Sequence, residues 1–167
     1  PYSDFYSRLV DSYACGFGII HCTTRPLDLY FKSLAEQVWR TTENRPLRLT
    51  CSDTAARWFG AGAREKMAEY LYLWVTESPK LGRETSDYFI DRKLGDLAGV
   101  LAGCERRSKL LDQVDESTLE PAQRDRLDYF KGLERFIADV HRTEDAFRRS
   151  ADLYQAGDLA GARDAMA

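Results

Sequence analysis

The chain has no long apolar run. Its uninterrupted apolar stretches are a few residues long, whereas a helix needs about 20 apolar residues to cross a bilayer. No basic segment followed by an apolar core stands ahead of the first predicted helix. These absences predict a soluble protein without a membrane partner. The compartment stays open, with the cytoplasm favoured.

The chain also lacks an excess of positively charged residues. Against 24 Lys and Arg residues stand 27 Asp and Glu residues, so the formal net charge is -3. A surface that binds the phosphate backbone of nucleic acid needs an excess of positive charge. Nucleic acid is therefore not an expected partner. The hydrophobic fraction of 44% and the length of 167 residues suit a globular protein with a core of its own.

Residues that bind metals are few. The chain has two histidines and four cysteines, and Cys15, Cys22, Cys51 and Cys104 show no C-x-x-C spacing. We therefore expect no metal site and no cofactor. The cysteines are interpreted as buried thiols, because free cysteine packs as a small apolar side chain. A disulfide between Cys15 and Cys22 is the alternative.

One segment differs from the rest of the chain. Residues 16–25 read Gly-Phe-Gly-Ile-Ile-His-Cys-Thr-Thr-Arg, and their β-branched and aromatic side chains favour extended structure. Apolar residues fill both faces, as in a strand buried in a parallel sheet. The segment predicts a β-strand that ends in a polar cluster. Because a single strand cannot satisfy its own backbone groups, its strand partners are expected in residues outside this sequence.

Helices are predicted on both sides of this strand. Residues 3–13 have helical spacing before it. After it, Thr24 can cap a helix that has Pro26 in its first turn. The expected buried side of this second helix is Leu27, Phe31, Leu34, Ala35 and Val38.

The remaining sequence predicts helices only. Gly60 and Gly62 end a short helix, and Lys80 to Arg92 read as a loop. Two longer helices follow, joined by an acidic turn at 115–120, and are expected to lie antiparallel. The apolar seam of the first is Leu94, Leu97, Leu101, Cys104 and Leu111. The seam of the second is Phe130, Leu133, Ile137, Val140, Phe147 and Tyr154.

The expected fold class is therefore mainly α. One βα unit occupies residues 1–45, and an antiparallel helical bundle occupies residues 46–167. Pro1 stands where an initiator methionine would be, and residues 158–167 read as a helix that has begun and not finished. We expect from these ends that the sequence is a piece of a longer protein.

Part of the chain resembles a known family. The similarity lies in residues 18–25 (Gly-Ile-Ile-His-Cys-Thr-Thr-Arg), 35–39 (Ala-Glu-Gln-Val-Trp) and 55–60 (Ala-Ala-Arg-Trp-Phe-Gly), and in the helix through Tyr70 and Trp74. These segments resemble the end of the catalytic barrel of α-glucuronidase-like glycoside hydrolases. There, a late strand of a (β/α)8 barrel carries a similar sequence and a helical domain follows. Cys22 departs from that pattern, in which tryptophan is expected.

The resemblance implies the C-terminal portion of a glycoside hydrolase. Its carbohydrate substrate would be a polysaccharide or oligosaccharide, including one that bears uronic acid. Residues 1–45 would end the barrel, and the missing N-terminal barrel residues would be partners of this chain. Glycoside cleavage needs two carboxyl groups across the scissile bond, and in this family they lie on earlier strands. The chain is therefore not expected to be catalytically complete by itself.

The candidate substrate-binding residues lie at the end of the predicted strand. They are His21, Thr23, Thr24 and Arg25, at the position where α/β folds bind ligands. No catalytic residue is assigned. His21 could line a sugar pocket or be a satisfied core histidine. Arg25 could bind a uronate carboxylate or pair with Asp28 at the helix start.

A second class of function is also open. The paired apolar seams and the connector at Gly157 and Asp158 favour a free-standing helical protein-interaction module without catalysis. A homodimer through the helical domain is a further expectation. The charged residues from Arg83 to Arg92 either reach a site in the longer protein or form a solvated loop.

Overall fold

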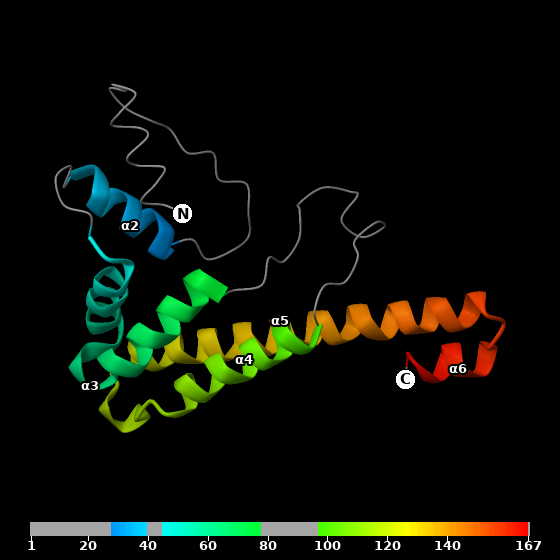
Figure 1. Cartoon of the computed structure of the whole chain (residues 1–167). Coiled ribbons are helices and arrows are strands. Elements are labelled where there is room, and N and C mark those ends of the chain that lie inside the picture. The colour runs from blue at the N-terminus through cyan, green and yellow to red at the C-terminus, as the bar shows by residue number, and fades with distance from the viewer. Residues whose placement is uncertain (1–27, 40–44, 78–96, 167) are drawn as a thin grey trace, which may run out of the picture. The chain divides into compact units, whose positions relative to one another are not determined.

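The computed structural model describes residues 28–39, 45–77 and 97–166, and in these ranges every regular element is a helix (Figure 1). The elements are α2 (Asp28–Trp39), α3 (Leu47–Glu77), α4 (Leu97–Asp112), the short 3-10 helix η2 (Glu116–Thr118), α5 (Pro121–Gln155) and α6 (Leu159–Asp164). Mainly α structure is thereby confirmed for these ranges. The predicted strand at 16–25 lies outside them, so the βα unit stays a prediction.

The contacts divide the chain into two compact units. Unit 1 consists of residues 1–76 and 114–119, and unit 2 of residues 77–113 and 120–167. The boundary at residue 45 that the sequence predicts stays a prediction. Within the described ranges, none of the helices has the length and hydrophobicity of a membrane span.

Helix α2 of unit 1 differs from the predicted burial at two positions, and the predicted Leu27, Leu34 and Val38 lie outside the described side chains. Leu29 and Ser33 are buried, whereas Phe31 and Ala35, both predicted to be buried, are exposed. The expectation for Phe31 and Ala35 is therefore wrong. The reason lies in a polar contact of Glu36 with α3, which apolar spacing alone does not reveal.

Glu36 connects α2 to α3 through hydrogen bonds and charge. The hydroxyl of Thr50 donates a 2.7 Å hydrogen bond to Glu36 Oε2, and Arg45 Nε lies 3.4 Å from the same oxygen. Burial raises the pKa of Glu36, but the bonds from Thr50 and Lys32 and the charges of Lys32 and Arg45 outweigh it, so the pKa lies below its ordinary value. The carboxylate stays ionised and holds α2 on this face.

A kink at Gly60 divides α3 into two arms, residues 47–59 and 61–77. Gly60 has φ 80° and ψ 176°, a conformation that is essentially restricted to glycine. The sequence correctly predicted a helix end here, although the helix resumes immediately after the kink.

The two arms fold back on each other. Arg48 Nη1 lies 2.6 Å from Glu69 Oε2, and Arg64 Nε donates a 2.9 Å hydrogen bond to Ser52 Oγ. Along their arms, Arg48 is about 18 Å and Glu69 about 14 Å from the kink, at 1.5 Å per residue. Their side chains can meet only if the arms enclose an acute angle. Helix α3 is therefore a helical hairpin bent at Gly60.

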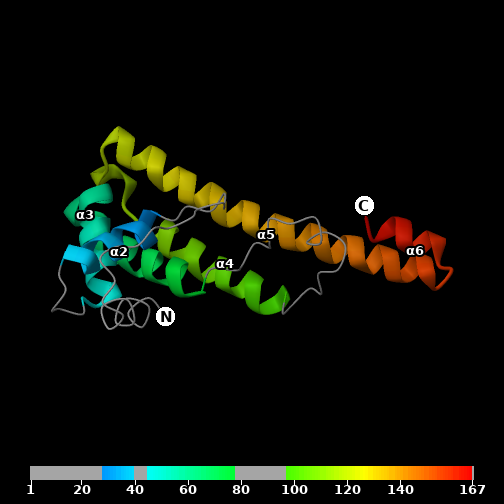
Figure 2. The same ribbon diagram turned by 90° about the horizontal axis from the view of Figure 1, so that it is seen from above.

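In unit 2, α4 lies antiparallel to α5, which confirms the predicted helix pairing (Figures 1 and 2). Arg107 of α4 pairs with Glu134 of α5, and five residues later in α4 Asp112 lies 3.9 Å from Lys131. The partner residues run in opposite directions along the two helices, as antiparallel packing requires.

The C-terminal turn also follows the sequence. Gly157 has φ 84° and ends α5, and Asp158 caps α6 by accepting a 2.9 Å hydrogen bond from the backbone N–H of Gly161. The hydroxyl of Ser150 in α5 donates a 2.7 Å hydrogen bond to the carbonyl of Ala162 in α6. Helix α6 is therefore held back against the end of α5 (Figures 1 and 2).

Candidate functional site

The sugar-binding residues predicted from the sequence lie outside the described residues. These are His21, Thr23, Thr24 and Arg25, and the charged loop at 83–92 lies outside as well. Their role stays a prediction. In the part of the chain that the structure describes, no group of three or more His, Cys, Asp or Glu side chains could hold a metal ion.

Between the two arms of α3, unit 1 has a hollow of about 380 Å³. Its polar lining is Arg48, Ser52, Arg64, Glu65 and Glu69. Positive and negative side chains occur in equal number, so the hollow offers no net charge to an ionic ligand.

The arginines of this hollow already have partners. Arg48 bonds to Glu69, and its guanidinium lies 3.8 Å from the centroid of the Tyr72 ring in a cation–π contact. Arg64 bonds to Ser52 and lies 3.6 Å from Asp53. These contacts join the arms of the hairpin, and we interpret the hollow as part of that connection rather than as a ligand site.

Cys51, next to the hollow, is expected to resist alkylation in the folded chain. It is 0% exposed. Burial raises its pKa to about 11; the charge of Arg48 lowers the pKa and that of Glu69 raises it further. The reactive thiolate is therefore scarce near pH 8. Iodoacetamide labelling followed by peptide mass spectrometry should modify Cys51 only after the chain is unfolded in urea.

The same shift of the Cys51 pKa predicts a dependence of stability on pH. The folded state holds the thiol proton more tightly than the unfolded state, whose ordinary pKa is 9.0. The free energy of unfolding should therefore fall as the pH rises from about 9 towards 11. A Cys51→Ala variant should lose this part of the decline. Equal alkylation rates in folded and unfolded chain would contradict both expectations.

The core of unit 2 contains a buried ion pair. Arg107 Nε and Nη2 each donate a 2.8 Å hydrogen bond to the two carboxylate oxygens of Glu134. Both side chains are at most 1% exposed. The Sγ of Cys104 accepts a further bond from Arg107 at 3.4 Å. Such a two-pronged pair fixes the register of α4 on α5, since each charge needs the other once water is excluded.

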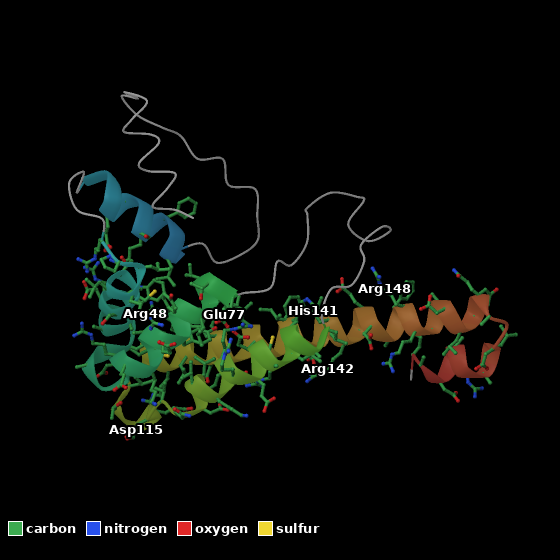
Figure 3. All side chains as sticks on the ribbon, viewed as in Figure 1. Arg48, Glu77, Asp115, His141, Arg142 and Arg148 are labelled. Carbon is green, nitrogen blue, oxygen red and sulfur yellow. The ribbon has the colours of Figure 1, made fainter. Side chains whose placement is uncertain are left out.

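His141 lies seven residues after Glu134 in α5, about two helical turns farther along (Figure 3). It is 2% exposed, and its Nδ1 lies 2.8 Å from the carbonyl oxygen of Ile137. Among the described residues, Nε2 has no hydrogen-bond partner. Because the side chain is buried, we assign it to the core.

Helix α5 also has an apolar face that is open to solvent. Four of its aromatic side chains are exposed: Tyr129 by 54%, Phe136 by 59%, Phe147 by 62% and Tyr154 by 66%. At 100° per residue, these four side chains point in directions that agree to within about 20° around the helix axis. They therefore form a line along the helix. The half-buried Leu133 and Val140 lie on the same line. We call these six residues the aromatic face.

The exposed apolar area of the aromatic face is large for a surface that binds no partner. An aromatic side chain has an area of about 150–250 Å², so the four exposed rings leave roughly 500 Å² open on this helix. The largest apolar patches of monomeric proteins are of about this size and are often binding sites. Tyrosine and phenylalanine are also enriched at the cores of protein interfaces.

The seam predicted for α5 combined two different faces. Phe130 and Ile137 are buried, as predicted, whereas Phe147 and Tyr154 are exposed, so the expectation of a single packed seam is wrong. Helix α4 has 16 residues and α5 has 35, so α4 cannot cover the length of α5. Phe136 was not part of the predicted seam, although its seven-residue distance from Tyr129 indicates a second seam.

Comparison with known proteins adds no assignment. No family model matches the chain, and no curated protein and no solved structure shows significant similarity to it. Its function therefore has to be inferred from the described side chains themselves.

Proposed function

We propose that this chain is a helical protein-interaction module and that the aromatic face of α5 binds another helix. The observation that carries this proposal is the line of four exposed aromatic side chains on one continuous helix. Binding of a helix with its own apolar seam would remove these rings from water, as in other helix-to-helix recognition.

The scaffold around the aromatic face supports such a role. Glu134 and His141 lie within α5 between the exposed rings, and both are buried on its other side. The ion pair of Arg107 and Glu134 fixes one side of the helix to α4, and Ser150 fixes its end to α6. A helix held in this way loses little conformational entropy when a partner binds.

The resemblance to glycoside hydrolases stays a separate prediction. Its strand and its candidate residues lie outside the described ranges, and so does the proposed βα unit at the end of a barrel. Both roles can belong to one protein, because the aromatic face lies in unit 2 and the sugar-binding residues would lie in unit 1.

A peptide-binding experiment tests the proposal. The probe is a synthetic amphipathic helix with leucine at every a and d position of four heptads, compared with the same peptide carrying serine at those positions. The chain is immobilised at low density, so that its copies do not meet. We expect the leucine peptide to bind, and Phe136→Ser/Phe147→Ser to weaken it at least ten-fold, because two rings of the contact are lost.

The control substitutes two exposed arginines on another side of α5. Arg135→Ser/Arg142→Ser should leave peptide binding unchanged, and both double variants should keep the helical circular dichroism of the parent. Folding should survive in each, since all four side chains are exposed. Equal binding to the two double variants, or equal binding of the leucine and serine peptides, would exclude the aromatic face as the docking surface.

A further inference from the structure

The aromatic face of α5 has an internal symmetry. Tyr129 and Tyr154 are equally far from a point between His141 and Arg142, and Phe136 and Phe147 are equally far from the same point. The order of the rings is thus Tyr, Phe, Phe, Tyr in either direction along the helix. When a second copy of this helix is placed antiparallel to the first, each of these rings therefore lies opposite a ring of the other copy.

The symmetry extends to a complete heptad seam. Successive steps of four and three residues join Tyr129, Leu133, Phe136, Val140, Thr143, Phe147, Ser150 and Tyr154. Alternating steps of this kind are the a and d positions of a coiled coil. Every position has a counterpart at the same distance from the central point, so the seam could pair with a second copy of itself without a shift in register.

We propose that the partner of the aromatic face is the α5 helix of a second copy of this chain, packed antiparallel about a two-fold axis between His141 and Arg142. This inference rests on the proposed function and names its partner. Two-fold pairing places Tyr129 against the partner's Tyr154, and Phe136 against the partner's Phe147. An interface of this type uses the same patch on both copies.

The two polar positions of the seam fit this pairing. Thr143 would face the partner's Val140, and Ser150 would face the partner's Leu133. The hydroxyl of Thr143 already donates to the carbonyl of Asp139 at 2.8 Å, and that of Ser150 donates to the carbonyl of Ala162 at 2.7 Å. Neither hydroxyl would therefore lose its hydrogen bond when the seam is buried.

Charge favours the antiparallel direction over the parallel one. In a parallel pair at this register, Asp139 at a g position would face Glu144 of the partner at an e position, and the contact would occur twice. Like charges in such positions repel. In the antiparallel pair, the same positions bring Asp139 near the partner's Ala146, and Glu144 near the partner's Ile137. The repulsion is then absent.

The available area is sufficient for a stable pair. Two copies of the four exposed rings would remove roughly 1,000 Å² from water. The aliphatic members of the seam and the residues beside it would bring the total into the range of about 1,200–2,000 Å² that specific interfaces bury. The seam is about 38 Å long at 1.5 Å per residue, which gives the pair more than three heptads of contact.

Sedimentation equilibrium tests whether this surface associates. The full chain should approach twice its mass of 19.1 kDa at concentrations up to about 100 μM, where a micromolar contact is populated. Phe136→Glu/Phe147→Glu should sediment as a monomer, because each layer would then contain two carboxylates. A wild-type chain that stays monomeric, or a glutamate variant that dimerises like the wild type, would overturn the inference.

A charge exchange tests the direction of the pair. In Phe136→Glu/Phe147→Lys, antiparallel packing places each new glutamate opposite a lysine of the partner. This variant should dimerise at least ten-fold more tightly than the variant with two glutamates. Parallel packing would place like charges together in both variants, so equal dissociation constants would contradict the antiparallel arrangement.

Distances between spin labels provide a second readout of direction. A genetically encoded label at Arg142 lies beside the proposed axis, whereas a label at Gln155 should be separated from its copy by about 40 Å along the helix, at 1.5 Å per residue. A parallel pair would give similar distances at both positions, and that result would overturn the proposal.

The two proposals fail in different ways. If the immobilised chain binds the leucine peptide through Phe136 and Phe147 while the free chain stays monomeric, the partner is a different helix and only this inference fails. If the peptide does not bind and the chain dimerises through another surface, both proposals fail.

Discussion

Replacing Glu134 by alanine is expected to lower the free energy of unfolding by about 3–5 kcal/mol, the usual cost of breaking a buried ion pair from one side. The substitution takes from Arg107 the carboxylate that it contacts through two 2.8 Å hydrogen bonds. The side chain of Arg107 is 1% exposed, so water cannot replace that carboxylate unless the packing of α4 on α5 opens. Urea unfolding followed by circular dichroism measures the loss.

An exposed ion pair in α4, the helix that contains Arg107, provides the control. Lys109 lies 2.6 Å from Glu105, and both side chains are 67% exposed. Because water solvates these charges, Glu105→Ala should leave the free energy of unfolding almost unchanged. Comparing the stability losses of Glu134→Ala and Glu105→Ala isolates the effect of burial, because the two carboxylates have partners at similar distances.

A double substitution distinguishes the effect of an uncompensated buried charge from the effect of lost packing. Arg107→Met/Glu134→Leu replaces both members by apolar side chains, and it should restore most of the lost stability, because no charge remains buried. If the double variant is as unstable as Glu134→Ala, the loss comes from packing rather than from an uncompensated charge.

Replacing Gly60 by alanine is expected to cost about 1–3 kcal/mol, which is the range for a residue forced into a sparsely populated backbone conformation. Gly60 has φ 80° and ψ 176°, and the Cβ of an L-residue clashes with the backbone there. The bend also brings Arg48 to Glu69 and Arg64 to Ser52. A chain that relaxes the bend therefore loses these contacts as well.

The same substitution in α5 should have the opposite effect. Gly132 lies within a regular helix, and a Cβ built there has nothing within 4 Å. Gly132→Ala should therefore stabilise the chain by about 0.5–1 kcal/mol, the difference in helix propensity between the two residues. Thermal unfolding of both variants checks the pair. Equal effects at positions 60 and 132 would show that the conformation of Gly60 is not the cause.

Much of the local structure could be predicted from single residues. Gly60, Gly157 and Asp158 end or begin helices where the sequence indicated, because a positive φ and a side-chain cap depend mainly on the residue itself. The antiparallel pairing of α4 and α5 was equally predictable, since a short turn between two apolar helices leaves few alternatives.

The candidate interaction site was only partly predictable. The heptad pattern identified Leu133, Val140, Phe147 and Tyr154, but it placed them in one seam with Phe130 and Ile137. Phe130 and Ile137 differ from the aromatic face by roughly a quarter turn at 100° per residue. With two apolar lines so close together, spacing cannot decide which one packs within the chain.

The sequence by itself determined where the described helices form and where they break, because propensity, caps and glycine conformation act within a few residues. Only the tertiary structure decided which faces are covered. The buried pair of Arg107 and Glu134 selects one side of α5 for α4, since both charges need each other away from water. The aromatic face is left open by that choice. Contacts between residues distant in the sequence therefore determine which side of α5 is covered, and local sequence patterns do not.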